Sequence, residues 1–196
     1  MTPWGYSVDA DELPPLIDTA TFFSMVGAAF DADDERVAPT LEAVSAAIRG
    51  WCGWHVAPAF SCEVVTQGGG SVLSLPTLAL RSVDAVVVKG VEVDPACVEF
   101  RRSGLVKARG RWPHEWGSVA IGFTSGYDVE AVRDVAAVAA QLAANSLAAA
   151  PGVRREQAGG VSIEYNQTAN GVTGGVALLA RDMAMLAPYR LPAVPR

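Results

Sequence analysis

Histidine and cysteine are scarce in this sequence of 196 residues, which contains two histidines and three cysteines. Because Cys52, Cys62 and Cys97 are odd in number and irregular in spacing, they do not outline a disulfide framework, and we expect three free thiols in a reducing compartment. Zinc sites usually combine two closely spaced ligand pairs, and Cys52 with His55 supplies only one. We therefore expect no bound metal and no cofactor.

Signatures of catalysis and of phosphate binding are also missing. No serine lies in a Gly-x-Ser-x-Gly turn, and the segments GGG at 68–70 and TGG at 173–175 lack the lysine and the strand-to-helix context of a phosphate loop. A catalytic base would have to be His55 or His114, and no pair of carboxylates stands out as an acid and a base. We expect no catalytic residues and a protein that is not an enzyme.

Charged residues are few, at 18%, whereas 51% of the residues are hydrophobic and the mean hydropathy is +0.25. So low a charge content indicates apolar surface that is covered by other copies or by partners. The net charge of -6 is unevenly distributed, because the first 50 residues hold nine acidic against two basic side chains and the remainder is nearly neutral. Nonspecific DNA binding by the whole surface is therefore not expected.

Long apolar runs are absent too. The most apolar helical stretch, residues 135–150, is mostly alanine and is interrupted by Gln141 and Asn145, so it is too weakly hydrophobic for a bilayer. The first residues lack the basic start and the apolar run of a signal peptide. We expect a soluble protein that is not secreted and does not bind a membrane.

The order of the remaining patterns predicts an α+β fold. It is a helical bundle, made of a long alanine-rich helix plus N- and C-terminal helices, with a small antiparallel β-sheet inserted in the middle. We expect an N-terminal arm and short helix over 1–32, a single domain over 33–190 and a tail over 191–196. Within the domain we expect a helix over 33–52, a β region over 60–124, a helix over 128–150 that Asp128 caps, a flexible loop over 151–175 and a helix over 176–187.

Helical periodicity is clearest at 33–52. Apolar residues recur there at intervals of three and four along one face, namely Val37, Leu41, Val44 and Ile48. Acidic residues occupy the expected first turn, where they favour the helix dipole. Because proline is tolerated only near a helix start, the helix either begins near residue 37 or bends at Pro39.

Short β-branched runs, separated by glycine or proline, fill residues 60–124 and predict one small antiparallel sheet. The runs are CEVV, SVLSL, VDAVVVKG, VEV, CVEFR, LVKARG and SVAIGFTSG. QGGGS and RRSG are predicted to be hairpin turns, since glycine adopts positive φ without steric cost.

The stretch WCGWH at 51–55 begins like a dithiol active site, but a histidine replaces the second thiol. One interpretation is a small thiol- or metal-dependent enzyme that uses Cys52 and His55. The favoured interpretation is packing, in which Cys52 is a small buried residue while Trp51 and Trp54 seal the end of the helix against the sheet.

Five basic residues fall within eleven positions: Arg101, Arg102, Lys107, Arg109 and Arg111. On a two-residue alternation they project from one hairpin. There they contact DNA phosphates or protect a solvated β-edge, and the second interpretation is favoured.

Four segments in this order resemble the head-to-tail connector (adaptor) proteins of tailed bacteriophages, especially actinobacterial ones, over roughly residues 33–190. They are WCGWH at 51–55, the Leu-Pro turn at 75–76, TSGYD at 124–128 and PYR at 188–190. None is a catalytic signature, and all are turns, caps or packing elements. The structural anchors that they supply are Trp51, Cys52, Trp54, His55, Tyr127, Asp128, Tyr189 and Arg190.

The resemblance implies a structural virion protein at the head–tail interface, or neck, assembled in the host cytoplasm. It would be a subunit of a cyclic homo-oligomer, expected to be a dodecamer, that binds the portal protein and docks the tail or a stopper (head-completion) protein. DNA would pass through the channel with at most transient contact, and the basic residues of 101–111 would face the channel or an interface. Ring contacts need two different complementary patches, which the acidic N-terminal segment and the more basic middle would supply.

Overall fold

The computed structural model describes residues 2–10, 13–27, 30–31, 33–148, 155–158, 161–164 and 176–192. The chain divides into two compact units. We call the first the β-rich unit, formed by Met1–Leu13, Cys52–Ala131 and Tyr189–Arg196, and the second the helical unit, formed by Pro14–Trp51 and Val132–Pro188. The backbone therefore passes from one unit to the other at four places along the sequence.

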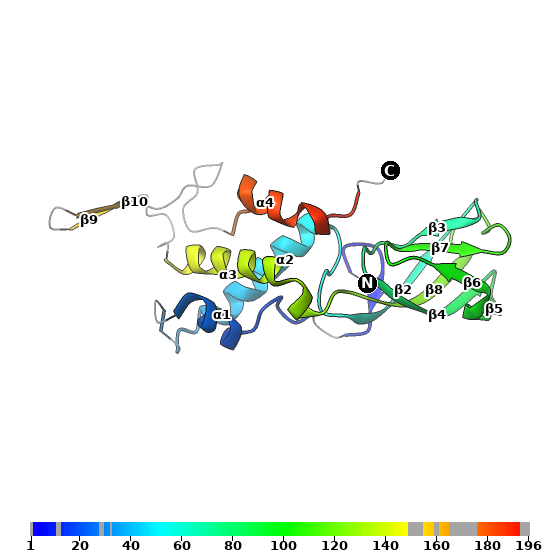
Figure 1. The fold of residues 1–196 in the computed structure, drawn as a ribbon, viewed down its shortest axis with the longest axis horizontal. Helices are drawn as coiled ribbons and strands as arrows, with labels where there is room; N and C mark the ends of the chain where they lie inside the picture. Colours follow the sequence, from blue (N-terminus) through cyan, green and yellow to red (C-terminus); the bar gives the residue numbers. More distant parts are fainter. Residues whose placement is uncertain are drawn as a thin grey trace. The chain divides into compact units, whose positions relative to one another are not determined.

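The larger sheet of the β-rich unit has five antiparallel strands in the order β1-β2-β8-β4-β5 (Figure 1). Their bounds are β1 Ser7–Val8, β2 Phe60–Thr66, β4 Leu80–Val88, β5 Val91–Val93 and β8 Val119–Ser125. The central strand β8 alternates strictly, with Val119, Ile121, Phe123 and Ser125 buried. Its other side chains therefore share the opposite face of the sheet.

The smaller sheet has three antiparallel strands in the order β3-β7-β6. These are β3 Val72–Ser74, β6 Val98–Phe100, which follows a 3-10 turn at Pro95–Cys97, and β7 Leu105–Ala108. Leu73 and Val106 are buried, whereas Val72 and Leu105 are exposed. The smaller sheet thus has one exposed face and one partly buried face, since Phe100 pairs with the buried Val106 but is itself 44% exposed.

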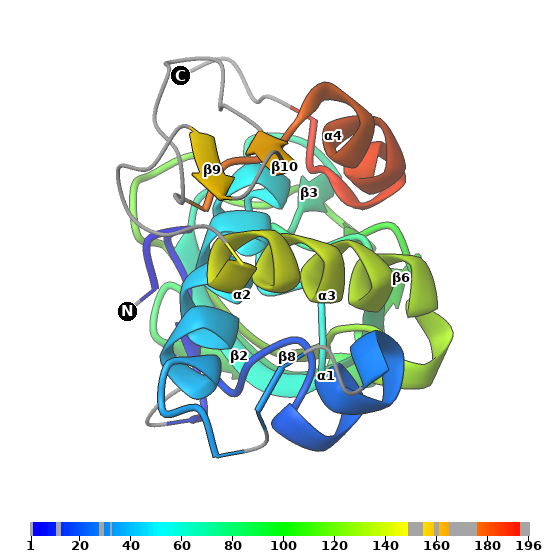
Figure 2. The same ribbon diagram turned by 90° about the vertical axis from the view of Figure 1, so that its left-hand side faces the viewer.

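The helical unit contains α1 Thr19–Val26, α3 Arg133–Ala148 and α4 Ala180–Leu186. It also contains α2, Val37–Cys52, except for the last residue of that helix, which belongs to the β-rich unit. Helix α3 lies between α1 and α4 and contacts both (Figure 2). It buries eight residues, most of them alanine or valine, and exposes a narrow stripe that includes Gln141 and Asn145. None of the described helices is long and apolar enough to cross a membrane.

Helix α2 begins at Val37 and not at residue 33. Pro39 therefore lies in the first turn, where its missing N–H has no intrahelical partner to lose. The four apolar residues of the predicted face are buried as expected, namely Val37, Leu41, Val44 and Ile48.

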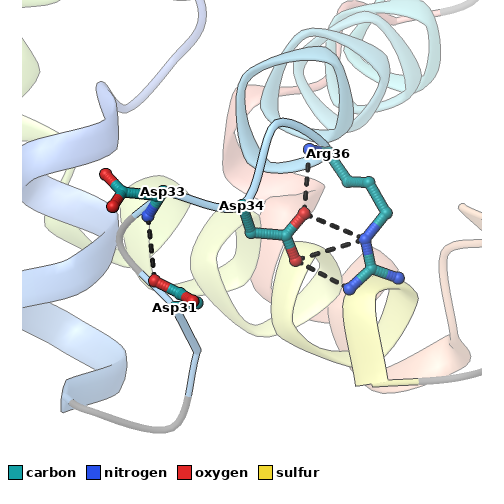
Figure 3. A network of polar contacts seen from close by, with 4 residues as sticks. All are labelled: Asp31, Asp33, Asp34 and Arg36. Atoms are coloured by element: carbon teal, nitrogen blue, oxygen red, sulfur yellow. Dashed lines mark hydrogen bonds and ion pairs between the residues drawn. The ribbon is translucent and has the colours of Figure 1, made fainter.

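The acidic residues thus precede α2 instead of forming its first turn. Figure 3 shows how they are held, with Asp31 accepting the amide N–H of Asp33 at 3.1 Å. The Asp34 carboxylate accepts a hydrogen bond from the Arg36 guanidinium at 2.6 Å. The hydrogen bonds from Arg36 lower the pKa of Asp34.

The prediction of a helical bundle with a small inserted sheet is wrong. The described strands outside β9 and β10 form two antiparallel sheets in a unit of their own. That unit also takes in segments from outside 60–124, since β1 pairs with β2 in the register Ser7↔Glu63. Such pairing between distant segments leaves no local pattern in the sequence.

The segment QGGGS is not a hairpin turn, because β2 and β3 belong to different sheets. It instead packs on Trp112, whose N–H donates to the Gly70 carbonyl at 2.7 Å. A Cβ atom on Gly68 would overlap the Trp112 side chain. Close approach to a tryptophan therefore requires the glycine at this position. The RRSG turn is confirmed, as Arg101 and Leu105 are hydrogen-bonded across it.

Three expected C-terminal elements also differ in detail. A 3-10 turn at Val129–Ala131 separates Asp128 from α3, so Asp128 does not cap that helix. Of the loop expected over 151–175, the structure describes only β9 Arg155–Ala158 and β10 Val161–Glu164, which pair as a hairpin, and the rest lies outside the described residues. The last helix is shorter than 176–187 and continues as a 3-10 turn at Ala187–Tyr189.

Candidate functional site

A completely buried histidine lies at the centre of the candidate site. His55 is 0% exposed, and its Nε2 lies 3.0 Å from the carbonyl oxygen of Ser125. Because a carbonyl only accepts, Nε2 carries the hydrogen and Nδ1 accepts the Tyr6 hydroxyl at 2.8 Å. The Tyr6 oxygen in turn accepts the backbone N–H of His55 at 3.0 Å. Both ring nitrogens of the buried imidazole therefore have partners inside the protein.

Aromatic rings surround this imidazole. The ring centroids of Trp54, Tyr6 and Phe60 lie 5.5, 6.0 and 6.0 Å from that of His55, all with edge-to-face geometry. Trp54 is also fully buried, and edge-to-face packing adds stabilisation beyond the buried area. The cluster is therefore built as packing around one hydrogen-bonded histidine.

Three of the sequence motifs meet at Trp54. Its Nε1 donates to the carbonyl of Tyr189 at 2.7 Å, which joins WCGWH to PYR. The Tyr127 ring of TSGYD lies 5.7 Å from Trp54 and 5.6 Å from Tyr189. The amide of Leu191 donates to the Cys52 carbonyl at 2.9 Å and adds a second connection to the C-terminal segment.

The TSGYD turn requires its glycine. Gly126 has a φ of +123°, and a Cβ atom there would lie 2.4 Å from the Pro58 oxygen and 2.9 Å from His55 Nε2. Arg81 holds the outer side of the turn. Its Nε donates to the Gly126 carbonyl at 2.8 Å, and its Nη2 donates to the Asp128 carboxylate at 2.7 Å. Asp128 thus forms a solvent-exposed ion pair with Arg81.

Tyr127 has further contacts in the same turn. Its N–H donates to the carbonyl of Val56 at 2.8 Å, and Val56 has a φ of +64°, which is unusual for a β-branched residue. The guanidinium of Arg102 lies 5.5 Å from the ring centroid of Tyr127. Burial raises the pKa of the Tyr127 phenol, and the Arg102 charge partly opposes that shift.

The cysteines are free thiols, and two of them are buried. Burial raises the pKa of Cys52 to about 12, against a smaller opposing effect of Arg190, and raises the pKa of Cys62 to about 11. Neither thiol is in its nucleophilic form near neutral pH. No group of three or more potential metal ligands occurs among the residues that the structure describes.

The second histidine lies elsewhere, on the exposed loop at 111–118. His114 is exposed, and its neighbour Glu115 forms an ion pair with Lys89 at 2.7 Å. Trp116, on the same loop, is 88% exposed. These residues are not brought to the buried cluster.

The five basic residues are exposed, as expected, but they have separate roles. Arg102 stacks on Tyr127, Lys107 faces Glu99 across the β6–β7 pair at 3.5 Å, and Arg111 donates to the Gly69 carbonyl at 2.7 Å. The side chains of Arg101 and Arg109 form no hydrogen bond or ion pair with any part of the chain that the structure describes.

Of the remaining anchors, Trp51 lies half-buried in the last turn of α2, and Arg190 is exposed beside Tyr189. Sequence reasoning missed Tyr6, Arg81 and the close contact at Gly126. The glycine in TSGYD was the only local signal, because Tyr6 and Arg81 reach the cluster through strand pairing.

No family model and no curated protein matches the chain. Solved structures do. A chain in the neck of an empty GTA (gene transfer agent, phage-like) particle computed with C6 symmetry is 22% identical, with a TM-score of 0.62 and coverage of 96% of this chain and 97% of that chain. A chain in the neck of a native GTA particle computed with C12 symmetry is 18% identical, with a TM-score of 0.60 and the same coverage. The chain thus has the fold of proteins found in these necks, in agreement with the resemblance seen in its sequence.

Proposed function

We propose that the protein is a structural subunit of the neck of a phage-like particle, namely a head-to-tail connector (adaptor). It assembles into a cyclic homo-oligomer, with twelve subunits as the expected number, beneath the portal protein. The ring docks the tail or a stopper protein, and the genome passes through its channel.

One observation carries the proposal. The fold similarity to a chain of a GTA neck extends over 96% of this protein and 97% of that chain, so it covers the β-rich unit and the helical unit together. A likeness confined to one unit would point only to a common module. The two symmetries in which the similar necks were computed, C6 and C12, favour a ring.

The buried cluster supports a structural role for the WCGWH, TSGYD and PYR motifs. Both ring nitrogens of His55 are bonded inside the protein, and the thiol of Cys52 is kept protonated by burial. A thiol- or metal-dependent enzyme would need a thiolate or an open ligand position at these residues. The same contacts join three distant chain segments, which is what a packing anchor does.

Assembly with a portal protein tests the proposal. The purified chain is mixed with the portal protein of the same particle, and the complexes are examined by electron microscopy and by light scattering after size-exclusion chromatography. We expect rings of this chain, twelvefold symmetric, on one end of the portal. A chain that stays monomeric at all concentrations and adds no ring to the portal contradicts the proposal.

Elemental analysis of the same preparation tests the enzyme alternative. The connector proposal predicts no stoichiometric metal, and a turnover activity lost on replacement of Cys52 or His55 in a folded variant would favour the enzyme.

A further inference from the structure

The five-stranded sheet has an exposed face of small and acidic side chains. Cross-strand pairing places Glu63, Gly122 and Ala85 in one row, because Glu63 pairs with Gly122 and Gly122 with Ala85. The next row, from the same register, is Val65, Ala120, Val87 and Glu92. We call these seven residues the acidic face.

The acidic face is hollowed. Residues of both rows line an open depression of about 500 Å³. The side chains at its floor are small. Gly122 and Ala85 lie so close together that a Cβ atom on Gly122 would come within 3.2 Å of the Cβ atom of Ala85. Small side chains let another protein surface come close to the backbone, and Val65, 56% exposed, offers apolar area at the edge.

The charges of this face are not neutralised by its own unit. The side chains of Glu63 and Glu92 form no hydrogen bond or ion pair with any residue in the described ranges. Both are exposed, so they leave a negative potential on the face.

The three-stranded sheet has an exposed face of the opposite sign. Val72, Lys107 and Glu99 form one row, since Val72 pairs with Lys107 and Lys107 with Glu99. Leu105 and Arg109 lie two residues before and two residues after Lys107, so the alternation of a strand places both on the same side as Lys107. We call these five residues, with Arg101 of the adjoining turn, the basic face.

The basic face also combines apolar area with unmatched charge. Val72 and Leu105 are 48% and 37% exposed. Arg109 and Lys107 line a second depression of about 270 Å³. The guanidinium groups of Arg101 and Arg109 lack partners within the described residues, so this face is positive where the other is negative.

The two faces belong to different sheets of one unit. Each lies on the side of its sheet that is turned away from buried side chains, such as Ile121 in the larger sheet and Val106 in the smaller. One copy therefore presents both an acidic and a basic surface without using either against itself. A contact between two unlike surfaces of identical chains is heterologous, and it forms a ring when the rotation from each copy to the next closes.

We propose that the acidic face of one copy binds the basic face of the next copy and that this contact builds the ring. The inference rests on the proposed function for the ring itself. It selects a second copy as the occupant because the unpaired charges have opposite signs, both faces expose valine or leucine, and both depressions permit close approach.

Charge reversal on one face at a time tests the contact. The acidic-face variant carries Glu63→Arg and Glu92→Arg, and the basic-face variant carries Arg101→Glu and Arg109→Glu. Each alone is expected to weaken self-association by more than about tenfold, because like charges then meet across the contact. Sedimentation velocity measures this, with the portal protein present if the wild-type chain needs it to form rings.

Mixing the two variants gives the decisive result. The unaltered basic face of the first binds the unaltered acidic face of the second, and the two reversed faces, now positive and negative, also attract each other, so mixing is expected to restore rings in which the two variants alternate. A chain with all four substitutions is expected to regain assembly, since both signs are then exchanged. Matched controls are Glu42→Arg and Arg133→Glu, exposed charges of the helical unit, which are expected to assemble like the wild type.

The outcomes separate this inference from the proposed function. Wild-type rings together with normal rings from both face variants overturn the inference and leave the function standing. The inference is also overturned if the basic-face variant forms normal rings and differs from the wild type only in binding DNA more weakly. That result would indicate that the basic face contacts the genome. A wild-type chain that forms no ring, even with the portal protein, contradicts the function and the inference together. Circular dichroism and melting temperature establish that each variant is folded.

Discussion

Tyr6 and His55 are 49 residues apart in sequence, yet the phenol oxygen of Tyr6 lies 2.8 Å from Nδ1 of His55 in the buried part of the β-rich unit. The same oxygen accepts the His55 backbone N–H at 3.0 Å. One hydroxyl thus holds both the ring and the backbone of the histidine. The N-terminal segment, which the resemblance did not cover, is therefore part of the cluster that the motifs build.

Replacement of Tyr6 by phenylalanine is expected to destabilise the protein by about 1 to 3 kcal/mol, because it leaves a buried acceptor and a buried donor of His55 without that partner. Chemical denaturation followed by circular dichroism measures the change. The control is Tyr127→Phe. It also removes a tyrosine hydroxyl, but one that makes a longer hydrogen bond, of 3.3 Å to the Leu78 carbonyl. An equal or larger loss in the control would contradict the role given to Tyr6.

Replacement of Gly126 by alanine is expected to cost more than about 3 kcal/mol, since the positive φ is joined by overlap with Pro58 and His55. Gly5→Ala separates the two effects. Gly5 has a φ of +86° with no atom near the added Cβ, so only the backbone cost of about 1 to 2 kcal/mol remains. Similar melting temperatures for the two variants would show that the turn relaxes.

Replacement of Trp54 by phenylalanine is expected to lower the free energy of unfolding by about 2 to 4 kcal/mol, through a cavity and a lost hydrogen bond to Tyr189. The same change at Trp116, which is 88% exposed, is expected to cost less than about 0.5 kcal/mol. Thermal unfolding of the two variants compares them directly. A loss at position 54 as small as that at 116 would remove the anchor role.

The cysteines predict a loss of stability at high pH. The pKa of Cys52 is raised from 9.0 to about 12 in the folded chain, so the folded state holds its proton more tightly than the unfolded state. The resulting stabilisation is fully present below pH 9.0 and is lost as the pH rises toward about 12. Cys52→Ala is expected to flatten this decline between about pH 9 and about pH 10.5, while costing about 1 to 3 kcal/mol at neutral pH.

Thiol labelling provides an independent check. Cys97 is exposed, whereas Cys52 and Cys62 are buried with raised pKa values. A maleimide is therefore expected to modify one thiol per folded chain and three after denaturation. Rapid modification of two or three thiols in the folded chain would contradict the burial of the cluster.

Local patterns predicted the parts of the fold that depend on neighbouring residues. The spacing of Val37, Leu41 and Ile48 gave the buried face of α2, and each predicted strand segment of 60–124 contains a strand. Pro39 left two alternatives, a helix that begins near residue 37 or one that bends at the proline, and in the structure the helix begins at Val37.

Pairing between distant segments could not be predicted in this way. The β-branched runs were assigned to one small sheet because nothing local distinguishes β2, which pairs with β8, from β3, which pairs with β7. For the same reason QGGGS was interpreted as a hairpin turn, and the edge strand at Ser7–Val8 was missed. The WCGWH motif indicated packing, but its partners Tyr6, Ser125 and Tyr189 come from three other parts of the chain.

The two units are interleaved along the polypeptide, and this affects how the chain withstands proteolysis. Because four covalent connections join them, at 13–14, 51–52, 131–132 and 188–189, cleavage of any single one leaves three intact. A subunit nicked once by a protease would still keep its halves tethered. Neither half, conversely, can be produced as one uninterrupted fragment, so fusion tags and genetic truncations act on both at once.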